Sequence, residues 1–131
     1  MPVPPPAVPA SALAPRKLAW SDLPSDRPMP RITRRRVMGE RMMISEVRLE
    51  RGFDLASHRH ENEQLVVMVQ GRCLFGLGEP GGADFREVEL RTGEVLVLPP
   101  NAPHSCRALE DSHILDVFSP VSERTGVDQR G

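Results

Sequence analysis

The sequence lacks a long apolar run and a marked net charge, and each absence narrows the classes of protein it can encode. No stretch approaches the roughly 20 apolar residues that a membrane-spanning helix needs. The 17 basic and 18 acidic residues give a net charge of −1, so there is no electrostatic reason to expect nucleic acid or an anionic membrane as a partner. We therefore expect a protein that binds neither of them.

A paired cysteine motif and a secretory signal are also missing. Cys73 and Cys106 do not form a CxxC pair, and reduced thiols are the default expectation in a cytosolic protein. The opening residues, MPVPPPAVPASALAP, have neither a basic region nor an uninterrupted apolar core. The sequence therefore predicts a cytoplasmic protein.

Proline content divides the chain, whose 131 residues suit a single folded domain. Six of the 14 prolines fall in residues 1–15, which we predict to be a disordered Pro/Ala-rich arm. We expect a barrel over residues 31–121 and a flexible tail over residues 122–131. Residues 16–30 are predicted to be an extended lead-in, with Leu18 and Trp20 packing on the barrel.

From Arg31 onward the sequence has the pattern of an all-β protein. Short runs of Val, Ile, Leu and Met are separated by glycine or proline turns, as in sandwiches and barrels. The runs 65–69 and 95–98 are apolar throughout, which suits strands buried on both faces, one of them lining an interior cavity. The predicted strands cover residues 32–38, 41–50, 55–58, 63–70, 72–78, 84–90, 95–98, 104–108 and 112–119.

Three of the four histidines form one pattern with a glutamine: His58, His60, Gln64 and His104. Side chains two residues apart share a face of a strand, whereas on a helix they point about 200° apart. Regular pairing puts residues 58, 60, 62 and 64 on one face and selects Gln64 over Glu63, although a bulge would break the count. Imidazole and amide oxygen would together suit one divalent metal ion, Zn, Ni, Fe, Mn or Co.

Other residues near this pattern leave alternatives open. Cys106 is a further candidate ligand, and the histidines could also fill a core or cap turns without any metal. His113 lies off the pattern, as a surface or inter-sheet residue. Asp116 interrupts an apolar run, so it either faces the cavity as an acid or base or pairs with an arginine at the barrel edge. The three arginines 34–36 are predicted to be a solvated face rather than a binding patch.

Two motifs resemble those of the cupin superfamily. The first cupin motif, G-x5-H-x-H-x(3,4)-E-x6-G, is matched from Gly52 to Gly71, with Gln64 in place of Glu. The second, G-x5-P-x-G-x2-H-x3-N, is matched from Gly93, with Asn101 in place of the second glycine and Ala108 in place of the final Asn. The resemblance covers residues 31–120. It implies a double-stranded β-helix, the cupin jelly-roll barrel, with a metal inside. The implied ligands are His58, His60, Gln64 and His104.

The C-terminal part resembles more narrowly the small cupins of pectin and alginate breakdown, which convert 4,5-unsaturated monouronates to their linear keto form. Those proteins carry HxHxxEQ and a tail DVFSPPRED, against HRHENEQ and DVFSPVSER in this chain. The resemblance implies catalytic roles for Asp116 and for Phe118 as a substrate-facing aromatic. It also implies an arginine at the position where this chain has Ser122. Serine cannot bind a carboxylate in the bidentate way that arginine does. The nearest arginine, Arg124, lies two residues later.

Three functions fit these motifs. The first is a metal-dependent isomerase or tautomerase for a small, oxygenated, sugar-acid-like substrate, with Asp116 moving protons. The second is a metal-dependent dioxygenase, and the third is a non-enzymatic cupin that binds a small ligand. The resemblance also implies a homodimer, for which residues 16–38 could supply an exchanged strand.

Overall fold

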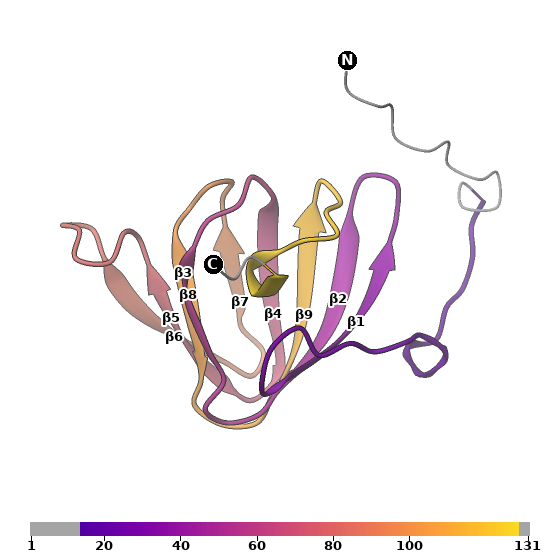
Figure 1. Ribbon diagram of the computed structural model, residues 1–131, viewed down its shortest axis with the longest axis horizontal. Coiled ribbons are helices and arrows are strands. Elements are labelled where there is room, and N and C mark those ends of the chain that lie inside the picture. The colour runs from indigo at the N-terminus through magenta and orange to yellow at the C-terminus, as the bar shows by residue number, and fades with distance from the viewer. Residues whose placement is uncertain (1–13, 129–131) are drawn as a thin grey trace, which may run out of the picture.

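The computed structural model describes residues 14–128, and within them two antiparallel sheets face each other (Figure 1). Sheet A has the order β1-β2-β9-β4-β7 and sheet B the order β3-β8-β5-β6. Most of the arm predicted for residues 1–15 lies outside the described residues. The strands are β1 (Ile32–Met38), β2 (Met43–Leu49), β3 (Asp54–His58), β4 (Glu63–Gln70), β5 (Arg72–Leu77), β6 (Arg86–Arg91), β7 (Val95–Leu98), β8 (His104–Ala108) and β9 (Ser112–Ser119).

This architecture is the predicted all-β jelly roll. Five strands, β1, β4, β7, β8 and β9, have the predicted bounds, because each is flanked by a turn residue that the sequence shows. Strand β6 begins at Arg86 rather than at residue 84, since Phe85 still belongs to the preceding turn, where its N–H donates to the Gly82 carbonyl. Two short 3-10 turns, η1 (Trp20–Asp22) and η2 (Gly126–Asp128), complete the described part.

Alternating burial along the strands builds the interior. On β4, Val66 and Met68 are both 1% exposed, and they point into the space between the sheets. The prediction that residues 95–98 are buried on both faces is wrong: Val95 and Val97 are 54% and 58% exposed. The reason is that β7 is the edge strand of sheet A and nothing in the described residues covers its outer face.

The lead-in lies along the outer side of β1 and β2. Leu18 and Trp20 border the same groove as Val37 and Ile44, which agrees with the predicted packing of the lead-in on the barrel. The contact is loose, since Leu18 remains 47% exposed. Among residues 14–128 there is no helix long and apolar enough to span a membrane.

The tight link between β4 and β5 provides a test of the fold. Gly71 has φ 121°, and a Cβ there would lie 2.7 Å from Cα of Ser112, whereas Gly93 has φ 87° with open space around it. We expect Gly71→Ala to lower the free energy of unfolding by about 3 kcal/mol, because backbone strain and overlap add. Gly93→Ala, the matched control, should cost about 1 kcal/mol from strain alone. Urea unfolding measures both, and equal losses would contradict the close approach of Gly71 to Ser112.

Candidate metal centre

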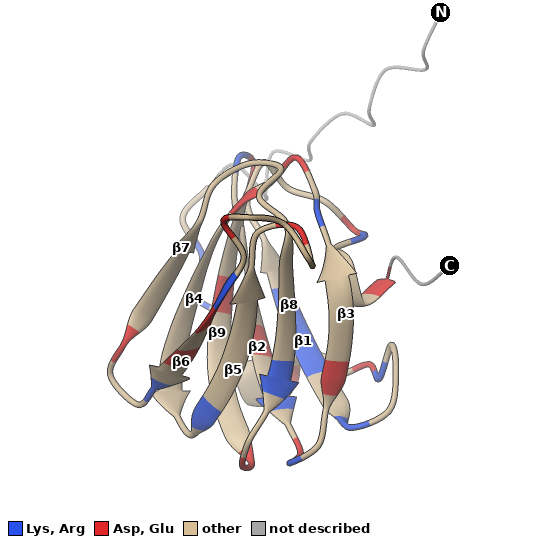
Figure 2. Ribbon diagram, turned by 90° about the vertical axis from the view of Figure 1, so that its left-hand side faces the viewer, with Lys and Arg blue, Asp and Glu red and all other residues tan. Residues whose placement is uncertain are grey.

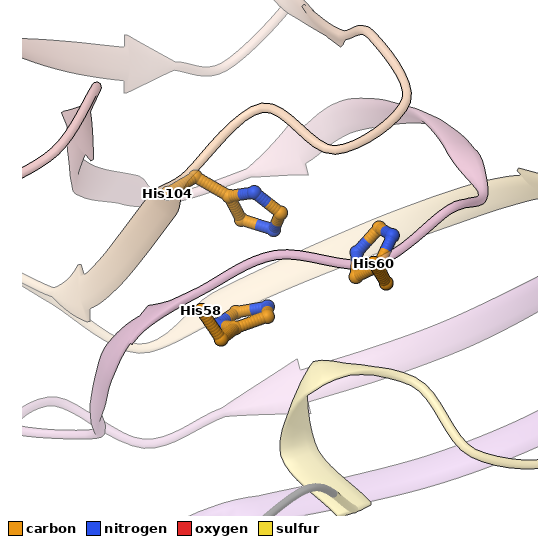
Figure 3. A group of neighbouring side chains, drawn as sticks. All are labelled: His58, His60 and His104. Atoms are coloured by element: carbon orange, nitrogen blue, oxygen red, sulfur yellow. The ribbon is translucent and has the colours of Figure 1, made fainter.

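The three histidines of the motif meet between the two sheets (Figure 3). His58 is the last residue of β3 and His104 the first of β8, and the two are paired across these neighbouring strands. His60 does not continue the strand: it lies in the loop between β3 and β4. The predicted regular face is therefore wrong in detail, because the ladder shifts between Leu55 and His58 and the strand then ends. The loop, rather than the pleat, brings His60 to the other two.

The imidazoles are close enough to hold one ion. Their ring centroids are 4.3 Å apart for His58 and His104, 5.1 Å for His60 and His104, and 5.6 Å for His58 and His60. One nitrogen from each ring lies within 4.8 Å of the others. His60 and His104 are 8% and 4% exposed.

Backbone carbonyls orient all three rings. The Nδ1 of His58 lies 3.0 Å from the Ala56 oxygen and that of His104 lies 2.9 Å from the Ala102 oxygen. The Nδ1 of His60 lies 3.1 Å from the Asn62 oxygen. A carbonyl oxygen only accepts, so in each neutral ring Nδ1 carries the proton and Nε2 keeps its lone pair. Metal-binding histidines commonly have this arrangement, with the second nitrogen held by the protein.

Gln64 completes the cluster from β4. Its amide Nε2 donates to Oδ1 of Asp116 at 3.0 Å, which turns Oε1 toward His60, whose Nε2 is 3.2 Å away. The two atoms are within hydrogen-bond distance. In the tautomer that has its proton on Nδ1, Nε2 and Oε1 both offer lone pairs that one cation could accept. Two ligands bound at about 2.1 Å and at right angles would be separated by about 3 Å. The donor set thus fits a divalent ion, although Gln64 as a ligand stays a prediction.

Burial keeps these histidines ready to bind. Desolvation lowers the pKa of His58 and lowers that of His104 to about 4, and the neighbouring imidazoles lower both further. Both rings are therefore neutral at pH 7, which is the form that coordinates a metal.

Asp116 and Phe118 lie on the inner face of β9, next to the histidines. Asp116 borders the same cavity as His58 and His104, and Phe118 contacts the ring of His60 edge-on with centroids 5.9 Å apart. Desolvation raises the pKa of Asp116 to about 6, while the hydrogen bond from Gln64 opposes that rise. Asp116 faces the cavity and pairs with an amide, not with an arginine, and its role as an acid or base stays a prediction.

The prediction of a solvated arginine face over residues 34–36 is wrong for Arg34. This side chain is 3% exposed and lines the cavity from β1, where strand alternation turns positions 34 and 36 inward and 35 outward. Figure 2 shows the basic band on β1. Although burial opposes its charge, hydrogen bonds to Asp128 and Asp26 hold the pKa of Arg34 above its ordinary value.

The segment after β9 closes the cavity. Residues 122–128, predicted to be a flexible tail, lie between the two sheets and end in η2 (Figure 1). Gly126 lies so close to His58 that a Cβ would overlap the Nε2 of the ring. Thr125 and Gly126 are buried, and the space left inside is about 60 Å³. No sequence signal indicated this closure, because residues 122–128 have no apolar run and the tail motif, which ends at Arg124, does not show where the segment folds.

The remaining candidates lie outside the cluster. Cys106 lines the cavity but is not part of the histidine group, and it forms no disulfide with Cys73. His113 is on the outer side of sheet A, where its Nε2 is 2.9 Å from Glu46. Arg124 is exposed and donates to the Asp128 carbonyl at 3.2 Å, so in this structure it does not take the place of an arginine at Ser122.

Fold and site together define a class: a small jelly-roll barrel with an interior three-histidine group suited to a divalent metal ion. The chain belongs to the cupin family, since the model of that family's cupin domain (Cupin_2) matches residues 45–118.

Solved structures agree with this assignment. KdgF from Halomonas sp. is 26% identical, with a TM-score of 0.74 over 84% of this chain and 97% of the other. A RmlC-like cupin from Shewanella frigidimarina is 17% identical, with a TM-score of 0.73 over 84% and 95%. Oxalate decarboxylase from Bacillus subtilis is 23% identical, with a TM-score of 0.71 over 81% of this chain and 30% of the other. At these identities the last two show the fold alone. No curated protein matched the chain.

Metal titration tests the ligand set. We expect one divalent ion, such as Mn²⁺, to bind per chain, and His104→Ala to weaken its affinity at least about 100-fold, since even outer-shell partners of a ligand are worth ~10–100-fold. Gln64→Ala should cost about tenfold, because an amide is a weaker donor than imidazole. His113→Ala is the control and should bind like the native protein. Isothermal titration calorimetry measures all four proteins, and unchanged affinity in His104→Ala would rule out the site.

The histidine pKa values predict the pH dependence of the metal-free protein. The pKa of His104 is 6.5 in the unfolded chain and about 4 in the folded protein. Between these two pH values the unfolded state binds a proton that the folded state does not, so the free energy of unfolding falls as the pH falls. In His104→Gln this part of the loss should disappear. Urea unfolding at several pH values, with a chelator present, compares the two proteins. Parallel curves would mean that His104 titrates normally in the fold.

Proposed function

We propose that the protein is a metal-dependent isomerase that converts a small unsaturated sugar acid, of the 4,5-unsaturated monouronate class, to its keto form. One observation carries this proposal: Asp116 lies at the wall of the histidine cavity, fixed by the amide of Gln64, which itself faces His60. The motif resemblance to the uronate-ketonising cupins and the 26% identity to KdgF from Halomonas sp. support it.

The reaction is an isomerisation that moves one proton overall. The bond between C1 and the ring oxygen breaks as the C1 hydroxyl loses its proton and becomes an aldehyde. The electron pair of that bond stays on the ring oxygen, which gives an enol at C5. This enol takes up a proton at C4 and loses one from oxygen, which leaves a C5 ketone. No atom is gained or lost, so no oxidant or reductant is needed.

Asp116 suits the proton transfers in this scheme. A carboxyl group with a pKa of about 6 exchanges protons readily near neutral pH, in both directions. Gln64 holds Oδ1, so that Oδ2 is left to act on the substrate. Phe118, on the same face of β9, provides an apolar wall beside His60 that would exclude water from an enol intermediate.

The implied metal would be held by His58, His60 and His104, with Gln64 as the fourth ligand. When bound there, a divalent ion would supply positive charge that stabilises an enolate-like oxygen. A neutral His3Gln set leaves the charge of the ion unneutralised, which favours an anionic substrate over a neutral one.

Asp116→Asn tests the acid–base role. The amide keeps the size of the side chain but cannot exchange protons, so we expect turnover of a 4,5-unsaturated monouronate to fall about 10²–10⁴-fold. Loss of the ultraviolet absorbance of the conjugated double bond measures the rate, and Mn²⁺ titration checks that the metal still binds. Asp54→Asn, exposed at the start of β3, is the matched control and should retain native turnover.

The other outcomes of this assay separate the alternative functions. Turnover that is unchanged in Asp116→Asn would overturn the acid–base role. Turnover that requires dioxygen would indicate the dioxygenase, and binding without turnover a ligand-binding cupin. The homodimer and the cytoplasmic location expected from the sequence remain predictions.

A further inference from the structure

Arg34 holds two carboxylates at the cavity, where the proposed reaction gives it no role. Its Nε and Nη2 donate to Asp26 at 3.1 and 2.8 Å. Its Nη1 and Nη2 donate to Asp128 at 2.8 and 3.0 Å, in a bidentate pair. Asp26 precedes β1 and is 45% exposed, whereas Asp128 comes from η2 and is 18% exposed. The guanidinium therefore joins the barrel wall to the segment that closes it.

The position of Arg34 relates it to the candidate site. The registers of β1, β2 and β9 place Arg36, Ser45 and Asp116 in one row across sheet A, and Arg34 is the next inward residue on β1. Both Arg34 and Asp116 line the cavity that contains the histidines. A carboxylate bound at Arg34 would thus face the same enclosed space as the proposed acid–base group.

The polar contacts between the closing segment and the barrel come mainly from two arginines, and Val127 adds an apolar contact with the core. Residues 122–128 form no strand pairing in the described part of the chain. Arg34 binds Asp128, and Nη1 of Arg36 donates to the Glu123 carbonyl at 2.7 Å. The backbone N–H of Ser122 lies 3.3 Å from the Met43 sulfur, which is a weak acceptor. A segment without strand pairing, which has a single residue packed on the core, opens more readily than the strands of the barrel.

The closed cavity is too small for a sugar acid. It encloses about 60 Å³, whereas pockets for small organic ligands start at about 300 Å³. A sugar acid therefore fits only if part of the wall moves. Residues 125–127 are a part of that wall without strand pairing, and their motion would separate Asp128 from Arg34. Nη1 of Arg34 then loses its carboxylate partner and Nη2 keeps only Asp26, which is costly for a buried charge unless another acceptor replaces Asp128.

We propose that Arg34 is the residue that binds the substrate carboxylate, with Arg36 adding positive charge, and that Asp128 occupies the place of that carboxylate in the free protein. The identity of the substrate as a sugar acid rests on the function proposed above. The exchange replaces one carboxylate by another, so the charge around Arg34 is unchanged. A neutral ligand cannot replace the charge of Asp128, so the site would bind a carboxylate in preference to a neutral ligand. Arg34 would thus supply from β1 the carboxylate clamp that Ser122 cannot supply.

Binding of a matched pair of ligands tests this site. The probes are D-glucuronate and D-glucuronamide, which differ only in carboxylate against amide, titrated calorimetrically into the full-length, Mn²⁺-loaded protein. Asp128→Asn removes the competing charge, so we expect it to bind glucuronate about tenfold more tightly. Arg34→Gln combined with Asp128→Asn should bind glucuronate about 100-fold more weakly, with little change for glucuronamide.

Two controls separate binding from folding. Arg27→Gln removes an arginine that pairs with Glu50 at 3.3 Å on the surface, away from the cavity, and should bind both probes like the native protein. The double variant avoids leaving Asp128 buried and unpaired, and its unfolding transition confirms that it folds. Hydrogen exchange gives an independent readout: glucuronate, but not glucuronamide, should speed exchange in residues 122–128 of the native protein.

Each outcome decides between the inference and the proposed function. If Arg34 only fastens the segment, the variants will change stability but leave the ratio of the two affinities unaltered, and the inference fails. If the unsaturated uronate is turned over with a KM that neither variant changes, the inference fails while the function stands. If glucuronate binds with the expected dependence on Arg34 but no uronate is turned over, the carboxylate site stands and the proposed function fails.

Discussion

The pairing register of β9 with its two neighbours is the constraint on which the site depends. Asp116 lies opposite Ser45 on β2 and Val66 on β4, and Phe118 lies opposite Met43 and Gln64. Side chains alternate along a strand, so a slip by one residue would turn Asp116 and Phe118 to the outer face and bring their apolar neighbours inward. The correct register is favoured because it also buries Ile114 and Val66, each 2% exposed or less.

Hydrogen bonds then turn a group of side chains into an oriented site. Each histidine Nδ1 donates to a carbonyl two residues away, so the backbone of the motif that places the ring also selects its tautomer. Asp116 orients the Gln64 amide by accepting a hydrogen bond from its nitrogen. The result is that Nε2 of His60 and Oε1 of Gln64 lie 3.2 Å apart, where both can offer lone pairs to one cation. A metal ion that binds the folded cluster and not the unfolded chain would raise the free energy of unfolding.

Charge also governs how the cavity closes. Arg34 and Arg36 bind Asp26, Asp128 and the Glu123 carbonyl, and these contacts connect residues up to 94 positions apart. Hydrogen bonds from Arg34 and from the Thr125 N–H hold the pKa of Asp128 below its usual value, although burial alone would raise it. The contact is therefore a full ion pair at neutral pH. Gly126 fits over His58 only because it has no side chain, so the same segment covers both the ion pair and the metal ligands.

Most strands, the fold and the histidine cluster were predictable from the amino-acid sequence. Turn residues and period-two burial are local features, so the bounds of β4 or β9 follow from a few neighbouring residues, and two spaced motifs suffice to link His58 and His60 to His104. Three features depend on contacts between distant segments: His60 reaches the cluster from a loop, Arg34 is buried, and Asp128 pairs with Arg34. A run of three arginines is usually solvated, and no local rule shows which of them a distant segment will cover. The burial of a charge depends on its partners, and here the partner is 94 residues away in the chain.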